Sequence, residues 1–357
     1  MRAESLQFLK DIVNAPSPSG FEEPAARVYR AYTEAFADKV ETDFHGNVIA
    51  CLNPEAKTKV MLAGHMDEIG FIVHYINDKG LIYFQPIGGH DRTIPLGQRV
   101  WIHGKTKLAG VLGRKPIHLL EAKEREVMPE LSDMWIDVGA KSKEEVLEHI
   151  SLGDPITYQV EFIDLLGGRA AARGFDNKMG AMIVAEALRL LKEEGGLHPE
   201  VGVYAVGTVQ EEIGLRGART SSYGVDAQTG LAVDVNFAID HPGVSKEKHG
   251  DTEMGKGPTV SRGANTNPVV YRLVTEAAAE NEIPIQIDPA PGGTGTDANA
   301  MQLNRAGMAV GLVGVAIRYM HCPGEVLELN DVELCAKLMA AYCRKVTPET
   351  DFRPGIG

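Results

Sequence analysis

The spacing of apolar residues changes along the chain, and each change marks a different kind of predicted structure. In the first stretch, apolar residues at helical spacing predict amphipathic helices over residues 5–13 and 22–37. The run KVMLA at residues 59–63 is apolar at almost every position, which is typical of a strand buried on both faces. The chain therefore begins with elements of an α/β fold.

The stretch from residue 68 to residue 165 consists of short β-like runs separated by Gly, Pro and Asp. Runs of this length and spacing are typical of a small barrel or sandwich. In chain order they are GFIVHYI, GLIYFQPI, QRVWIHG, LAGVLG, MWIDVG and DPITYQVEF.

After residue 174, predicted helices alternate with apolar strands. The helices are predicted over residues 177–194, 215–222, 267–281, 297–305 and 332–346, and the strands are VGVYAVGTV, GLAVDV, IPIQID and MAVGLVGV. Such alternation predicts a sheet with helices on both faces. The simplest organisation is one α/β domain built from residues 1–67 and 166–357, with residues 68–165 inserted as a β domain.

Composition and charge reduce the number of function classes that fit the chain. Of the 357 residues, 44% are hydrophobic, which is enough apolar material for a folded core. The net charge of −13 makes the chain a poor partner for nucleic acid and for anionic membranes. The N-terminus lacks the apolar core of a signal peptide, and the apolar run at residues 308–317 is about half of a membrane-spanning length. We therefore expect a soluble, cytoplasmic protein with no nucleic-acid or membrane partner.

Acids and histidines follow the apolar strands, where ligands of α/β sheets usually bind. One such residue alone is most often a turn residue or a helix cap. Several acids packed together would repel one another, and divalent cations would remove that repulsion. Two histidines with three or four carboxylates suit two Zn²⁺ or similar ions that share one carboxylate. The candidates are His65, Asp67, Asp176, Glu211, Glu212, Asp234 and His321.

A glycine-rich segment, GTGTDA at residues 293–298, fits the pattern G-x-G-x-x-A. A dinucleotide site is disfavoured, because Asp297 would repel a pyrophosphate and no acid follows at the expected distance. We interpret the segment as a substrate loop, with Gly295, Thr296 and Asp297 as substrate-binding residues. The motifs of P-loop proteins, HExxH metalloproteases and GxSxG hydrolases are absent.

Several motifs in a fixed order make the sequence resemble the tetrahedral (TET) aminopeptidases, a family that also contains glutamyl and deblocking aminopeptidases. The match spans nearly the whole chain. The motifs are SPSGFE (17–22), GHMDEIGF (64–71), KPIHLL (115–120), GFDNKMG (174–180), TVQEEIGLRGA (208–218), AVDV (232–235), GTGTDA (293–298) and RYMHCPGE (318–325).

The resemblance implies a mixed-sheet α/β/α catalytic domain of the phosphorylase/hydrolase-like kind, with a PDZ-like β-barrel inserted at residues 68–165 for dimerisation. It also implies a metal-dependent aminopeptidase that removes N-terminal residues from short peptides. Self-association into dimers, and often into tetrahedral dodecamers, belongs to the same expectation.

The resemblance also implies a role for each site residue. Glu211 would be the general base that acts on a dimetal-activated water, and Asp67 would orient His65. The ligand sets would be His65, Asp176 and Asp234 for one ion and Asp176, Glu212 and His321 for the other, with Asp176 as the bridge.

Some alternatives stay open. The family often has Asp-Asp-Arg at the bridging acid, whereas Asp176 is followed by Asn177 and Lys178, which puts the metal preference in doubt. We expect two divalent ions per subunit, with Zn²⁺ favoured over Co²⁺ and Mn²⁺, although residue types alone do not separate them. A deacylase or carboxypeptidase of the related dimetal superfamily would use the same ligands. A metal-free glycosidase and a non-enzymatic scaffold are further alternatives.

Overall fold

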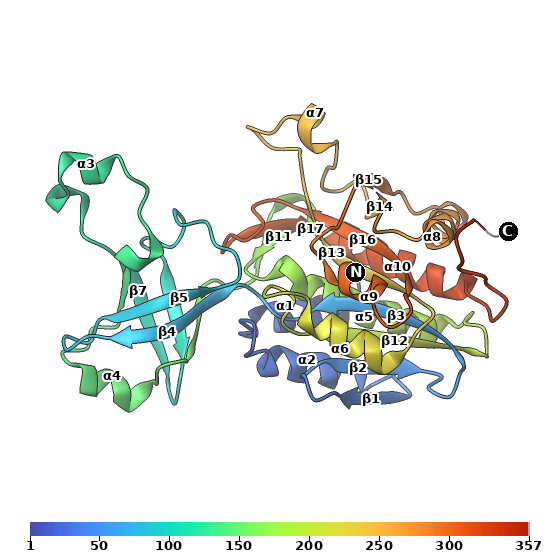
Figure 1. The fold of residues 1–357 in the computed structure, drawn as a ribbon, viewed down its shortest axis with the longest axis horizontal. Helices are drawn as coiled ribbons and strands as arrows, with labels where there is room; N and C mark the ends of the chain where they lie inside the picture. Colours follow the sequence, from blue (N-terminus) through green and yellow to red (C-terminus); the bar gives the residue numbers. More distant parts are fainter. Residues whose placement is uncertain (356–357) are drawn as a thin grey trace.

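The computed structural model describes residues 1–355, and its main feature is an eight-stranded mixed sheet with the order β1-β2-β12-β3-β13-β16-β14-β15 (Figure 1). The four central strands run parallel to one another. Apolar runs such as VGVYAVGT are buried at every position, which is typical of parallel strands covered by helices on both faces. The strands are β1 (Lys39–Thr42), β2 (Val48–Leu52), β3 (Thr58–His65), β12 (Val201–Thr208), β13 (Thr229–Phe237), β14 (Thr259–Gly263), β15 (Gln286–Ala290) and β16 (Ala309–Ile317).

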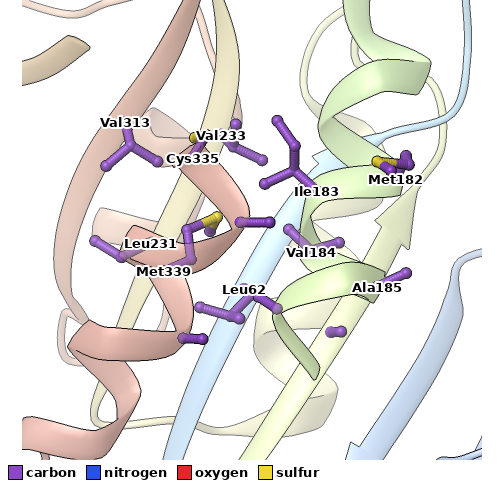
Figure 2. Close-up of a cluster of buried hydrophobic side chains, with 14 of the residues drawn as sticks. Leu62, Met182, Ile183, Val184, Ala185, Leu231, Val233, Val313, Cys335 and Met339 are labelled. Carbon is purple, nitrogen blue, oxygen red and sulfur yellow. The ribbon is translucent and has the colours of Figure 1, made fainter. Parts of the chain in front are cut away.

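Helices cover both faces of this sheet. On one face pack α1 (Ala3–Asn14), α2 (Glu23–Thr33), α5 (Phe175–Glu194), α8 (Pro268–Glu280) and α10 (Leu329–Lys345). On the other face lie α6 (Arg216–Val225) and α9 (Asp297–Gln302), while the short α7 (Lys246–His249) projects away from the sheet (Figure 1). Figure 2 shows the core on the α5 face, where Leu62 of β3 lies among Val184 of α5 and Met339 of α10.

A closed antiparallel barrel lies to one side of the α/β part (Figure 1, left). Its own core contains residues such as Phe71, Ile102 and Ile136. The strand order is β4-β5-β8-β7-β6-β9, with β4 (Gly70–Ile76), β5 (Ile82–Ile87), β6 (Arg99–His103), β7 (Lys107–Gly113), β8 (Trp135–Asp137) and β9 (Pro155–Tyr158). Short helices lie in the segments between its strands, namely η1 (Ile117–Leu119), α3 (Ala122–Arg125), η2 (Leu131–Asp133) and α4 (Lys143–His149).

A small three-stranded sheet joins chain segments that are distant in sequence. It has the order β10-β11-β17, with β10 (Ile163–Asp164), β11 (Arg169–Ala172) and β17 (Glu325–Glu328), and η3 (Leu166–Gly168) connects the first two strands. Because β10 pairs with β11, residues just before the predicted boundary at 165 pair with strands beyond it. The residues at which the inserted domain begins and ends stay a prediction.

The predicted fold class is confirmed, namely a helix-covered mixed sheet combined with a small β-barrel. All six β-like runs between residues 68 and 165 contain a barrel strand. The sequence patterns missed β1, β2, β14 and the three-stranded sheet, because these strands are short and lack a distinctive period. The predicted helices at 22–37 and 297–305 end earlier, at Thr33 and Gln302. Within residues 1–355, no helix combines the length and the apolar character needed to cross a membrane.

The carboxyl end of β3 packs unusually close to α5. A Cβ atom added at Gly64 would lie 2.4 Å from the backbone carbon of Gly180, and backbone cannot move aside as a flexible side chain can. Glycine at this position therefore allows the strand that carries His65 to approach α5, the helix that contains Asp176.

We predict that Gly64→Ala destabilises the protein by about 1–3 kcal/mol, the usual cost of overpacking. Gly224→Ala is the matched control, because that glycine is exposed near the end of α6 with open space around it. The control should be neutral or slightly stabilising, since alanine favours helix. Thermal unfolding midpoints at equal protein concentration measure both effects, and equal midpoints for the two variants would contradict the close-packing argument.

Candidate metal centre

Parallel strands bring the predicted site residues to one edge of the sheet. His65 is the last residue of β3, Asp234 lies in β13, and Glu211 and Glu212 follow β12. His321 comes just after β16. These residues, together with Asp176, line a cavity of about 600 Å³.

Asp176 lies between two groups of possible metal ligands. Its Oδ1 is 3.3 Å from Nε2 of His65, and its Oδ2 is 3.2 Å from Nε2 of His321. On the first side, Oδ1 of Asp234 is 3.8 Å from Nε2 of His65. On the second side, Oε2 of Glu212 is 3.5 Å from Nε2 of His321. Within each group, one ligand atom from every residue lies within 4.8 Å of the others, so each group is compact enough to surround one ion.

Both histidines present Nε2 to this centre because Nδ1 has another partner. Nδ1 of His65 lies 3.1 Å from the carbonyl oxygen of Asp67 and 3.3 Å from its Oδ1. Nδ1 of His321 lies 3.0 Å from the carbonyl oxygen of Gly89, in the segment that follows β5 of the barrel. A carbonyl oxygen can only accept, so Nδ1–H donates and Nε2 keeps its lone pair for a metal.

Asp67 is fully buried and connects three parts of the site. Its Oδ1 and Oδ2 accept the backbone N–H groups of Glu211 at 3.0 Å and Glu212 at 3.1 Å. Its Oδ2 also accepts the hydroxyl of Ser19, at 2.7 Å. Asp67 therefore holds the turn that carries the two glutamates as well as the imidazole of His65.

The charges at the centre perturb one another strongly. Burial, with the charges of Asp234, Asp297 and Asp67, raises the pKa of Glu211 to about 9, against the opposing effect of His65. Burial and the charge of Asp176 raise the pKa of Glu212 well above its ordinary value. For Asp176, burial alone would raise the pKa, but hydrogen bonds from His321 and His65, made when Nε2 is protonated, outweigh it and lower that pKa to about 2. Asp176 is thus held ionised while its neighbours resist ionisation.

The donor set fits divalent cations. Within residues 1–355, the ion-pair partners of Asp176, Glu211, Glu212 and Asp234 are imidazoles, and no Lys or Arg neutralises these acids. Oε1 of Glu212 is buried without a hydrogen-bond partner. Buried charge without a counter-ion is costly, and oxygen and imidazole ligands of this kind suit Zn²⁺ and related ions.

The two residues after Asp176, Asn177 and Lys178, contact residues outside the two ligand groups. The side-chain amide of Asn177 donates to the carbonyl of Val233 at 2.8 Å. Lys178 is fully buried and its Nζ lies 2.9 Å from Glu68, which Arg173 also contacts. Burial alone would raise the pKa of Glu68, but Arg173 and Lys178 outweigh it and lower that pKa to about 2. The lysine therefore neutralises Glu68 rather than a residue of either ligand group.

Glu325, the first residue of β17, is a site residue that the sequence patterns did not single out. It is 2% exposed, and its two oxygens accept the backbone N–H groups of Asp176 and His321, both at 3.0 Å. His321 has φ of 61°, a left-handed conformation that is uncommon for a residue other than glycine. Glu325 therefore holds the backbones of two candidate ligands in place. Its position in RYMHCPGE was the available signal, but nothing in that motif indicates which atoms the glutamate contacts.

Glu22 has a similar role on the opposite side of the site. Its Oε1 accepts the backbone N–H groups of Gly20 at 2.8 Å and Gln210 at 3.1 Å. Burial and the charge of Asp67 raise the pKa of Glu22 to about 7. Glu22 therefore fixes the residue just before Glu211, and the motif SPSGFE marked it without indicating this contact.

The predicted substrate loop is divided between cavity and core. Gly295 and Thr296 line the cavity. Asp297 begins α9 and is buried, and its Oδ2 accepts the hydroxyl of Thr208 at 2.5 Å. Substrate binding by these residues stays a prediction, and for Asp297 the contact with Thr208 gives the carboxylate a structural partner at the end of β12.

We predict that Glu325→Ala weakens divalent metal binding by about 10–100-fold, the usual effect of losing a residue that orients metal ligands. The matched control is Asp331→Ala, because buried Asp331 likewise accepts two backbone N–H groups, from Gly255 and Gly257. The control should change stability but leave metal affinity within about twofold, as expected for separate sites. Metal content after dialysis against graded chelator measures the effect, and equal losses in both variants would contradict the role of Glu325.

Known proteins are similar to this chain in sequence and in fold. The M42 glutamyl aminopeptidase family matches residues 46–338. Lysyl aminopeptidase of Pyrococcus furiosus is 37% identical over 352 residues, 98% of this chain and 99% of that protein. A TET aminopeptidase from a marine-sediment Thaumarchaeota archaeon has a TM-score of 0.92 at 35% identity and 97% coverage of each chain. Pyrococcus horikoshii TET1 peptidase, which can assemble into a tetrahedron or a large octahedral shell, has a TM-score of 0.84 at 32% identity, covering 96% of this chain and 100% of that one. The chain therefore belongs to the M42 glutamyl aminopeptidase family, whose members are dimetal enzymes, and it is an aminopeptidase.

Proposed function

We propose that the chain removes N-terminal residues from short peptides with two divalent ions, Zn²⁺ being favoured, and with Glu211 as general base. The observation that carries the proposal is the position of Asp176, whose two carboxylate oxygens face separate groups of ligands. One group adds His65 and Asp234, and the other adds Glu212 and His321.

Two bound ions would polarise the scissile carbonyl, lower the pKa of a water molecule towards ~7 and favour the ionised form of nearby acids, Glu211 included. Glu211 then takes the proton from the water and passes it to the leaving amine. Its position supports this role, because it lines the cavity and its Oε2 lies 3.7 Å from Nε2 of His65. Glu211 belongs to neither ligand group, which leaves its carboxylate free for proton transfer.

Asp67 supports the reaction without touching the cavity. It orients His65 through Nδ1 and holds the backbone of Glu211. The general base and a metal ligand are thereby fixed by one buried carboxylate. This arrangement matches the positioning that acid–base catalysis requires.

The cavity also supports action on free N-termini. A protonated α-amine would be attracted by the carboxylates that line the cavity, whereas the nitrogen of an N-acylated residue carries no positive charge. A deacylase or carboxypeptidase is for this reason not favoured, and the relatives named above are aminopeptidases.

We further propose that subunits assemble, as a dimer and then as a tetrahedral dodecamer, with residues 68–165 forming the dimer contact. The tetrahedral and octahedral assemblies of the Pyrococcus horikoshii relative support this proposal. Light scattering on the metal-loaded protein tests it directly, since a monomeric mass would contradict it.

We predict that Glu211→Gln lowers kcat at least ~100-fold while two ions per subunit remain bound. Glutamine keeps the size of the side chain but cannot accept the proton. Metal content by elemental analysis and initial rates on aminoacyl anilides measure the two expectations. Turnover close to that of the unmodified enzyme would remove Glu211 from the role, and loss of metal would show that it serves as a ligand instead.

Removal of metal should abolish hydrolysis, and Zn²⁺, Co²⁺ or Mn²⁺ added singly should restore it to different extents. The same assay should include N-acetylated anilides as a matched panel. Cleavage of the free-amine substrates alone supports an aminopeptidase, whereas preference for the blocked substrates would favour a deacylase. For the metal, hydrolysis that continues after complete chelation would contradict the metal-dependent mechanism.

A further inference from the structure

The cavity extends from the candidate metal centre towards the far edge of the sheet. Beyond Asp234 it is lined by residues of β14, β15 and β16, among them Thr259, Ser261, Asp288 and Gly314. A Cβ atom added at Gly314 would lie 2.6 Å from Oγ1 of Thr259, so glycine at this position leaves room for the Thr259 side chain in the cavity wall. The assigned chemistry uses none of these residues.

Asp288 lies at the end of this extension. Its Oδ2 accepts the hydroxyl of Ser261 at 3.1 Å, and the two residues are register partners on the parallel strands β14 and β15. Asp288 is half-buried, and within residues 1–355 it has no ion-pair partner. The carboxylate of Asp288 thus faces the cavity, where one hydroxyl holds it and no Lys or Arg of the described residues pairs with it.

Strand register gives the separation of Asp288 from the metal centre. Asp234 is the register partner of Gly314, and Gly314 is the register partner of Thr259, on the strand next to β15. Three strand spacings of about 4.8 Å separate the two strands by roughly 14 Å. Asp288 pairs with Ser261, two residues along β14 from Thr259, which adds about 6.6 Å along the strand and places the backbones of Asp234 and Asp288 roughly 16 Å apart. A long side chain is needed to reach from one end of this space to the other.

The walls between the two ends suit an aliphatic stem. Leu312, Val235 and Ala290 line the cavity and offer apolar surface. The methylene groups of a lysine or arginine would lie against such walls while the charged end reaches a carboxylate.

Basic residues nearby do not reach the cavity. Arg262 lies on the opposite side of β14, where its guanidinium is 5.3 Å from the ring centre of Tyr271 on α8. Lys246 pairs with Asp251 and Glu253. Among the residues that the structure describes, no Lys or Arg lines the cavity. An acidic substrate side chain would therefore meet negative charge without a compensating cation.

We propose that this part of the cavity receives the side chain of the substrate's N-terminal residue, and that Asp288 selects lysine and arginine there. The proposal rests on the aminopeptidase function given above. The ammonium or guanidinium group would donate to the other carboxylate oxygen of Asp288, Oδ1. The charge-assisted hydrogen bond would replace hydrogen bonds that both groups make to water before the substrate binds. Asp288 is then a specificity-determining residue, separate from the groups that carry the reaction.

The test uses the metal-loaded enzyme and anilides of lysine, arginine, methionine, leucine and glutamate. Methionine is the informative neutral comparison, because its stem is similarly unbranched. The unmodified enzyme should show kcat/KM for lysine and arginine at least ~10-fold above methionine, and lowest for glutamate. Asp288→Asn should lower kcat/KM for the basic substrates by ~10–100-fold, mainly through KM, the range expected for a lost charged hydrogen bond. The values for methionine and leucine should stay within about twofold.

The matched control is Asp251→Asn, because Asp251 is exposed and pairs with Lys246 outside the cavity. It should leave the order of substrates unchanged. Asp288→Lys should move the preference towards glutamate, which a purely structural role of Asp288 would not do.

Two results would overturn the assignment of Asp288. One is an unmodified enzyme that prefers leucine or glutamate, and the other is an equal loss on all substrates in Asp288→Asn. Failure to cleave any free-amine substrate would instead overturn the aminopeptidase function itself, so the two failures are distinguishable.

Discussion

Carboxylates buried side by side after β12, in β13 and at the start of α5 set the electrostatic constraint on which the rest of the structure depends. Asp176, Glu211, Glu212 and Asp234 share a space in which imidazoles, and no Lys or Arg of the described residues, lie within ion-pair distance of them. Burial opposes ionisation of all four acids, and repulsion from neighbouring carboxylates adds to that effect for Glu211, Glu212 and Asp234. Divalent cations satisfy the constraint, and they also supply the chemistry that a peptidase needs.

The constraint explains why contacts from distant parts of the chain meet at this point. Ser19 binds Asp67, Glu22 fixes the backbone before Glu211, and Glu325 holds Asp176 and His321. The barrel contributes as well, through the carbonyl of Gly89, which determines which nitrogen of His321 faces the centre. The barrel segment is thus part of the site's geometry, in addition to the assembly role proposed for it.

In the proposed mechanism, catalysis and selectivity occupy different strands of the same sheet. The reacting groups lie at β3, β12 and β13, whereas Asp288 lies at the edge strand β15. The separation allows the N-terminal preference to change through β14 and β15 while the metal centre is retained. A family whose members carry names as different as lysyl and glutamyl aminopeptidase is consistent with such a division.

The sequence by itself determined the residue types of the site, the α/β class and the barrel strands. Apolar period and strand-end acids are local features, and they identified His65, Glu211 and Asp234 together. The family resemblance implied the two ligand groups on either side of Asp176. Only the tertiary structure decided that Glu325 binds two backbones, and that Asp288 faces the cavity while Arg262 does not. The reason is that such contacts depend on strand order and on register between segments that are not neighbours in the chain, such as Asp176 and Glu325, which are 149 residues apart. No local pattern of apolar and polar residues encodes them.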